Sequence, residues 1–68
     1  MNKAILLNQL IGKNIKVYLK GGLVLKGTLD KLYYGEDFRG KFYSFAIKGE
    51  NGTIREFATI NVIGWDIL

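Results

Sequence analysis

The sequence predicts a mainly β fold, in which five antiparallel strands form one strongly bent sheet or small barrel behind an N-terminal helix. Three observations lead to this prediction. Short runs of residues alternate between apolar and polar, which is the period of a half-buried strand. Glycines lie between these runs or interrupt them, where they favour turns and bends. The chain has 68 residues, enough for one small core and a single domain over residues 1–68.

The first predicted element is a helix over residues 3–11. Asn2 is a suitable N-cap, and Gly12 stands where a helix commonly ends in a left-handed conformation. Apolar residues recur at helical spacing, so one face of the helix is expected to cover the barrel. These residues are Ile5, Leu6, Leu7, Leu10 and Ile11.

The next two predicted elements are strands over residues 14–20 and 23–32, which form a hairpin. Gly21 and Gly22 can adopt the positive φ angles that a tight reversal requires. Gly27 interrupts the second strand, where a missing side chain permits a sharp bend or a close approach of another backbone segment. The predicted inward residues of the first strand are Ile15, Val17 and Leu19.

The second half of the chain contains the other three predicted strands. Residues 33–41 are expected to form a loop or an extended hairpin tip, and the Gly-Glu-Asn-Gly run at 49–52 predicts a tight turn. The last strand ends in apolar sequence, so its open edge is expected to be covered by a neighbouring subunit. The three strands are predicted over residues 42–48, 53–57 and 61–68.

The amino-acid composition limits the kinds of stabilising site and partner that the chain can have. The chain has neither Cys nor His, which excludes disulfides and Cys/His zinc sites. A domain of this size has a marginal core, so oligomerisation is the remaining way to add stability. The net charge of +4 fits a polyanionic partner, and it equally fits an ordinary solvated surface.

No residue constellation predicts an enzyme. Ser44 is the only serine and has no base near it in sequence. The adjacent acids Glu36 and Asp37, beside Arg39, are typical of a solvated loop. No cofactor or metal is expected. The absence of a signal peptide and of a membrane-spanning segment predicts a cytoplasmic protein without membrane contact.

The best candidate site lies in the segment after the second strand. Tyr33, Tyr34 and Phe38 offer flat rings on which bases stack. The cations that flank them and can meet phosphates are Lys31, Arg39 and Lys41. This combination is typical of single-stranded nucleic-acid binding. The alternative is structural: the three rings pack on one another or on a neighbouring subunit and hold a long hairpin rigid.

Residues 4–29 contain an ordered series of short motifs without gaps. These are Leu6-Leu7 with Leu10, Gly12-Lys13, the alternating strand from Ile15 to Lys20, Gly22, and Gly27-Thr28-Leu29. The series resembles the first sequence motif of the Sm-like proteins, the family that includes the Sm proteins and bacterial Hfq. The resemblance implies a closed ring, with strand four of one subunit beside strand five of the next, and single-stranded RNA bound around a central pore.

The second half departs from the family pattern. Tyr33 stands where the family places an Asp, and no Asn follows until Asn51. Asn61, followed by Val62, matches the Asn-Val of the second motif, and the resemblance implies that it lines the pore. The Arg-Gly pair of that motif is replaced by Ala-Thr at residues 58–59.

Together these observations predict a non-catalytic RNA-binding protein that forms a homo-oligomeric ring of about five to eight subunits. The main alternative is an SH3-like small barrel that acts as a protein-interaction or assembly module without nucleic acid. A single-strand DNA-binding OB-fold is a third reading, disfavoured because the helix lies at the N-terminus. The predicted RNA-binding residues are Lys31, Tyr33, Tyr34, Phe38, Arg39 and Asn61.

Overall fold

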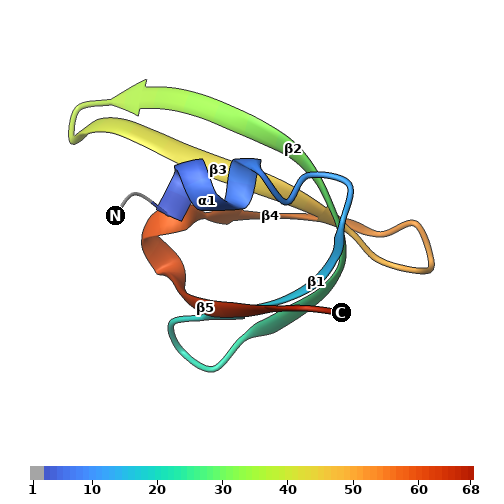
Figure 1. Cartoon of the computed structure of the whole chain (residues 1–68). Helices are drawn as coiled ribbons and strands as arrows, with labels where there is room; N and C mark the ends of the chain where they lie inside the picture. The colour runs from blue at the N-terminus through green and yellow to red at the C-terminus, as the bar shows by residue number, and fades with distance from the viewer. Residues whose placement is uncertain (1–2) are drawn as a thin grey trace.

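The computed structural model describes residues 3–68 and shows five antiparallel strands in one sheet with one short helix (Figure 1). The predicted mainly β class and the order of its elements are therefore confirmed. The predicted N-cap, Asn2, lies outside the described residues. The elements are α1 (Lys3–Asn8), β1 (Asn14–Leu19), β2 (Val24–Asp37), β3 (Gly40–Lys48), β4 (Ile54–Ala58), the 3-10 turn η1 (Thr59–Asn61) and β5 (Val62–Ile67).

The sheet has two open edges. Its strand order is β4-β3-β2-β1-β5, so β4 and β5 lie at opposite ends of the order although η1 joins them in sequence. Each neighbouring pair in this order is antiparallel. Figure 1 shows β2 and β3 as the two longest strands, which extend together beyond the rest of the sheet. The two edge strands keep backbone groups that no strand of the same chain pairs.

Glycines make the predicted reversals. Gly21 and Gly22 have φ angles of +86° and +87° between β1 and β2, and Gly12 has φ +91° after α1. The N–H of Gly12 donates a hydrogen bond to the carbonyl oxygen of Leu29 at 2.7 Å, which ties the turn after α1 to β2. The positive φ angles predicted at these three glycines are confirmed, although α1 ends four residues before Gly12, so Gly12 ends the turn and does not cap the helix itself.

Gly27 allows β2 to touch the end of β3. A Cβ atom at this position would lie 2.2 Å from the backbone oxygen of Lys48 and 3.1 Å from the nitrogen of Gly49. The predicted close backbone approach is thus confirmed. Two residues farther along β2, the pairing with β3 shifts register between Leu29 and Leu32, which places a bulge at residues 30–31.

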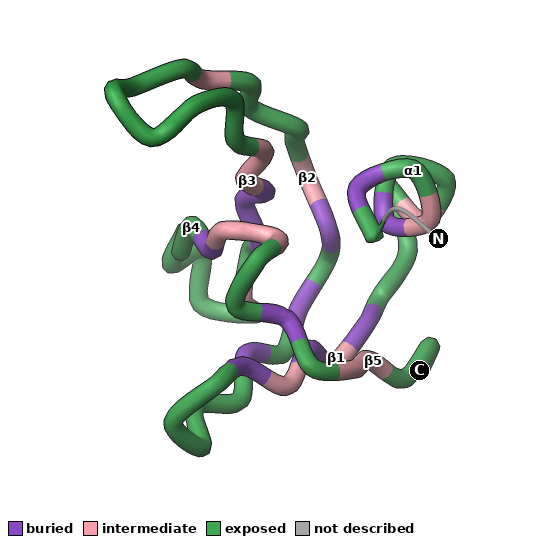
Figure 2. The backbone as a smooth tube through the Cα atoms, turned by 90° about the vertical axis from the view of Figure 1, so that its left-hand side faces the viewer, coloured by how far each residue is buried: buried purple, intermediate pink, exposed green. Residues whose placement is uncertain are grey.

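The core is built mainly from the inward residues of the strands. Phe45 on β3 and Phe57 on β4 stack with ring centroids 6.1 Å apart, and Phe45 is fully buried. Figure 2 shows the buried segments on β1, β2, β3 and α1. The core cluster comprises Ala4, Leu7, Ile15, Val17, Leu19, Leu25, Leu29, Phe45, Ile47, Phe57 and Val62.

The helix is shorter than predicted and buries a narrower face. It ends at Asn8, and Ala4 and Leu7 are its buried residues. Leu10 packs on the core from the turn that follows, whereas Ile5 stays 61% exposed and Ile11 stays 40% exposed. A helix of fewer than two turns brings only positions i and i+3 onto one narrow line, so the predicted stripe is buried only in part.

Of the two alternatives for residues 33–41, a loop or an extended hairpin tip, the structure confirms the hairpin. Both strands are longer than predicted, because β2 continues to Asp37 and β3 begins at Gly40, with a two-residue turn at Phe38 and Arg39 between them. The result is a long two-stranded ribbon over residues 33–44, here called the hairpin arm. Figure 2 shows that most of the arm is exposed. Its aromatic residues favour strand conformation, which explains why pairing continues to the turn.

Candidate nucleic-acid interface

The register of the hairpin arm decides which of its aromatic side chains share a face. Tyr34 is paired with Tyr43, and Tyr33 is paired with Ser44. Directly opposed residues in an antiparallel pair lie on the same face, and neighbouring residues along a strand lie on opposite faces. Tyr33 and Tyr34 therefore point to opposite faces and cannot form one stacking surface.

One face of the arm, here called the Tyr34 face, carries Tyr34, Tyr43, Glu36 and Lys41. The rings of Tyr34 and Tyr43 meet edge to face, with centroids 5.2 Å apart and planes at 60°. Tyr43 also packs against the core, so this pair joins the arm to the body of the sheet. Tyr34 keeps 54% of its surface exposed, which leaves its ring available to a ligand.

The opposite face, the Tyr33 face, carries Tyr33, Phe42 and Ser44. The ring of Phe42 lies directly over Gly35, because a Cβ atom there would be 2.2 Å from Cζ of Phe42. An aromatic ring that covers a cross-strand glycine stiffens the ribbon. Phe42 and Tyr33 remain 43% and 40% exposed.

The turn of the arm presents a single ring to solvent. Phe38 is 96% exposed, and the guanidinium carbon of Arg39 lies 5.5 Å from the centroid of its ring. The Asp37 carboxylate accepts hydrogen bonds from the backbone N–H and the Nη2 of Arg39, at 2.8 and 3.0 Å. The bond from the Arg39 side chain, followed by that from its backbone N–H, holds the pKa of Asp37 below its usual value of 3.8.

A cationic pocket lies where the arm meets the body, and we call it the lysine pocket. Its volume is about 500 Å³, and its three charged groups are all ammonium groups. They come from α1, from the turn after β1 and from β3, so the fold gathers them from distant parts of the sequence. The lining residues are Lys3, Lys20, Lys41, Phe42, Tyr43, Thr59 and Ile60.

The wall of the lysine pocket is held by hydrogen bonds. The ammonium group of Lys3 donates to the carbonyl oxygen of Val62, and the hydroxyl of Thr59 donates to the carbonyl oxygen of Tyr43 at 3.3 Å. Within residues 3–68, the one ion pair joins Arg39 and Asp37. In the described part of the chain, none of the three pocket lysines forms an ion pair, and the carboxylate on the facing strand is that of Glu36, the cross-strand neighbour of Lys41.

The structure brings together only some of the predicted site residues. Asn61 lies in η1, and its carbonyl oxygen accepts a hydrogen bond from the N–H of Lys20 at 2.8 Å, which places it beside the lysine pocket. Tyr34 adjoins the same pocket through Tyr43. Lys31 lies at the β2 bulge, exposed.

The remaining three predicted residues belong to other parts of the arm. Phe38 and Arg39 form its turn, and Tyr33 points to the opposite face. Sequence reasoning missed Lys3, Lys20 and Thr59. No local signal marks these residues, because each is an ordinary surface type until the sheet brings them together.

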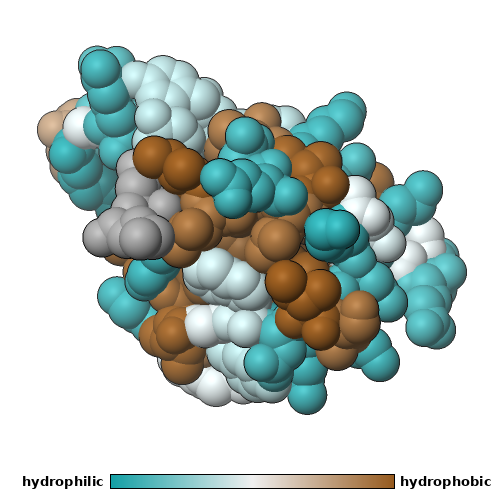
Figure 3. Space-filling model, viewed as in Figure 1, coloured by the Kyte–Doolittle hydropathy of each residue, from teal (hydrophilic) through white to brown (hydrophobic). Residues whose placement is uncertain are grey.

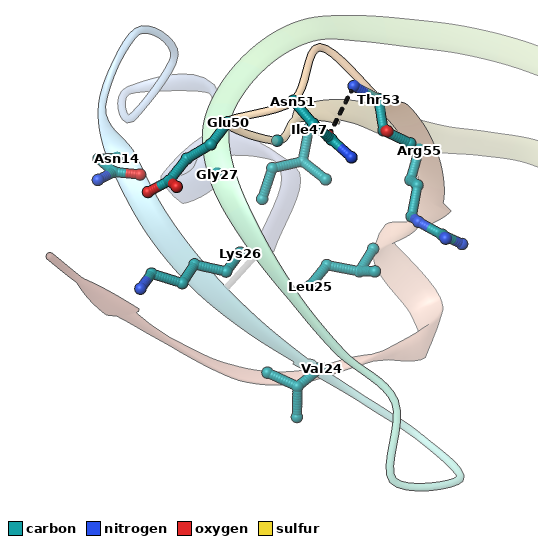
Figure 4. A pocket seen from close by; sticks show the side chains of 11 residues that line it. Asn14, Val24, Leu25, Lys26, Gly27, Ile47, Glu50, Asn51, Thr53 and Arg55 are labelled. Atoms are coloured by element: carbon teal, nitrogen blue, oxygen red, sulfur yellow. Dashed lines mark hydrogen bonds between the residues drawn. The ribbon is translucent and has the colours of Figure 1, made fainter.

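A second cavity, of about 540 Å³, lies between β2 and the β3–β4 turn (Figure 4). Leu25 and Ile47 lie toward its middle, and Lys26 and Glu50 lie on one side while Arg55 lies on the other. In the turn, the amide oxygen of Asn51 accepts a hydrogen bond from the N–H of Thr53. The mixture of a carboxylate with two cations makes this cavity a poorer site for a polyanion than the lysine pocket.

No protein family, curated protein or solved structure matches this chain. None of the helices in the described residues has the length and apolar character needed to cross a bilayer. Among residues 3–68, no group of three or more acidic side chains is placed to hold a metal ion.

Proposed function

We propose that this chain is a non-catalytic protein of the Sm-like type, which binds single-stranded RNA as a homo-oligomeric ring of strongly bent small barrels. The observation that carries this proposal is the lysine pocket beside the Tyr34 face. Three ammonium groups that form no ion pair within residues 3–68 line the pocket with Tyr43, whose ring contacts that of Tyr34. Cations for phosphates next to rings for bases are the combination that unpaired nucleic acid requires.

Each part of this site has a distinct role in the proposal. Lys20 and Lys41 contact phosphates, and Lys3 adds positive charge while it stays bonded to Val62. A base stacks on the exposed ring of Tyr34, an interaction worth about 1–3 kcal/mol per base. Asn61, whose backbone carbonyl oxygen accepts a hydrogen bond from Lys20, supplies its exposed side-chain amide to a base edge in this proposal. A ring repeats these modest contacts and converts them into avidity.

The open edges of the sheet support assembly into a ring. Exposed apolar side chains lie along both edge strands: Ile54 of β4 is 59% exposed, and Ile63 and Ile67 of β5 are 66% and 59% exposed. Figure 3 shows apolar surface over α1 and near the end of β5. Pairing of β4 with β5 of the next subunit would satisfy the free backbone groups and bury these side chains together.

The oligomeric state tests the assembly directly. Because apolar packing and backbone pairing resist screening, we expect light scattering at about 0.15 M and 0.5 M salt to give the same mass. That mass should correspond to a closed ring of about five to eight subunits. A monomer or dimer at either salt concentration would exclude the ring.

The proposed role of the lysine pocket in RNA binding leads to a second prediction. Replacing Lys20 and Lys41 with glutamine should weaken binding of an unstructured oligouridine and flatten its salt dependence. Since each phosphate contact on a single strand contributes about 0.7 to the log–log slope, the slope should fall by about 1.4. The measurement is a fluorescence-anisotropy titration at several salt concentrations.

The matched control replaces Lys13 and Lys26 with glutamine. Both lie outside the lysine pocket, and the control lowers the net charge by the same amount as the pocket variant. We expect the control to keep most of the salt slope. Equal losses in both double variants would show that binding is a general effect of charge and not a property of the lysine pocket.

A second candidate function rests on the Tyr33 face. Tyr33 and Phe42 form an exposed aromatic surface. In addition, this chain has Ala-Thr at residues 58–59, where the second motif of the Sm-like proteins has Arg-Gly. These features favour the SH3-like alternative, a protein-interaction or assembly module without nucleic acid. Wild-type protein that shows no salt-dependent affinity for RNA would support this alternative.

A further inference from the structure

We propose that the hairpin arm is a wedge, whose apical Phe38 enters the end of an RNA helix and opens base pairs next to a bound single strand. This inference rests on the proposed RNA-binding function and adds an activity to it. It begins with the exposure of Phe38, whose side chain is 96% exposed at the turn of a projecting ribbon. Apolar side chains in such positions are available to insert between bases.

The arm is stiff enough to deliver this ring. Pairing of β2 with β3 continues without interruption from Leu32 opposite Phe45 to Asp37 opposite Gly40. Rings brace both faces: Tyr34 against Tyr43 on one, and Phe42 over Gly35 on the other. Such cross-strand contacts offset the low stability of an isolated two-stranded ribbon.

The turn itself is also fixed. The Asp37 carboxylate holds both the backbone N–H and the side chain of Arg39, so the two turn residues keep one arrangement. The same guanidinium lies beside the ring of Phe38. The turn thus exposes the flat apolar ring of Phe38 with the Arg39 cation next to it.

The surroundings of Phe38 identify the partner as nucleic acid. The lysine pocket lies at the base of the arm, and the Tyr34 face connects the pocket to the ribbon. A strand of RNA held in the pocket would bring the adjoining paired segment toward the turn. The terminal base pair of a stem exposes a flat apolar face on which a phenyl ring packs, and the neighbouring phosphates are attracted to Arg39.

Opening the terminal base pair in this way requires no external energy source. A protein that holds the released strand more tightly than the paired strand shifts the equilibrium toward the open form. In this arrangement the lysine pocket and Tyr34 hold the released strand, while Phe38 replaces the stacking partner that the terminal base pair loses.

The test uses an RNA stem with a single-stranded uridine tail and 2-aminopurine in the terminal base pair beside the tail. Unstacking raises 2-aminopurine fluorescence, so wild-type protein at saturation should increase the signal. Phe38→Ala should abolish this increase, while the affinity for an unpaired oligouridine falls by less than about fivefold. Phe38→Trp, which keeps a flat ring, should retain the increase.

The outcomes separate the two proposals. If the wild-type protein binds no RNA, the proposed function fails and the wedge fails with it. If it binds the unpaired oligouridine but leaves the fluorescence unchanged, or if Phe38→Ala opens the stem as well as wild type, the wedge alone is overturned. Phe38-dependent co-sedimentation with phosphatidylglycerol vesicles, without stem opening, would instead assign the ring to a lipid surface.

Discussion

Replacing Gly27 with alanine is expected to lower the free energy of unfolding by about 3 kcal/mol, the upper end of the usual range for forcing extra atoms into a packed site. The new Cβ would lie 2.2 Å from the backbone oxygen of Lys48. Backbone atoms cannot rotate away as a side chain would, so β2 and the end of β3 have to separate. That separation disturbs the pairing next to the bulge at residues 30–31.

The measurement is urea unfolding of Gly27→Ala beside Gly64→Ala. Gly64 is the matched control, because a Cβ atom at that position would meet nothing within 4 Å. We expect the control to stay within about 1 kcal/mol of wild type. Similar midpoints for the two variants would show that the chain relaxes easily at Gly27, and that the close approach to Lys48 contributes little.

Replacing Phe45 with alanine is expected to cost about 3–5 kcal/mol, the usual range for truncating a buried phenylalanine. Its side chain is fully buried on β3, and its ring stacks on that of Phe57 at 6.1 Å. A domain of this size has a total stability of order 5 kcal/mol. The variant should therefore be largely unfolded at room temperature unless assembly stabilises it.

Circular dichroism and the fluorescence of the single tryptophan, Trp65, report this loss of structure. The control is the same substitution at Phe38, which is 96% exposed and should change stability by no more than about 0.5 kcal/mol. A folded Phe45→Ala variant with near-wild-type stability would contradict the central place that the structure gives this ring in the core.

Local sequence patterns were sufficient to predict most of the fold. Alternating residues marked β1, and the glycine pair at residues 21–22 marked its reversal into β2. The conformations at Gly12 and Gly27 were also predicted correctly. These features depend on backbone geometry and on the two-residue period of a strand, both of which act over a few neighbouring residues.

The same patterns left two alternatives open where pairing partners decide the outcome. Residues 33–41 were expected to form a loop or an extended hairpin tip, and the pairing of β3 with β2 as far as Asp37 confirms the hairpin and makes both strands longer than predicted. Since Tyr33 and Tyr34 are neighbours in a strand, they point to opposite faces. Which residues of the facing strand share a face with each of them depends on strand register, which a single segment does not contain.

Sequence alone thus specified the mainly β class, the order of its elements and the positions of its turns, because short-range sterics and periodicity carry that information. The lysine pocket arose only when the sheet formed. Its cations at Lys3, Lys20 and Lys41 are distant in the chain, and the order β4-β3-β2-β1-β5 brings their elements together. Pairing between strands that are distant in the chain sets the arrangement of these lysines, so the pocket could be identified only from the tertiary structure.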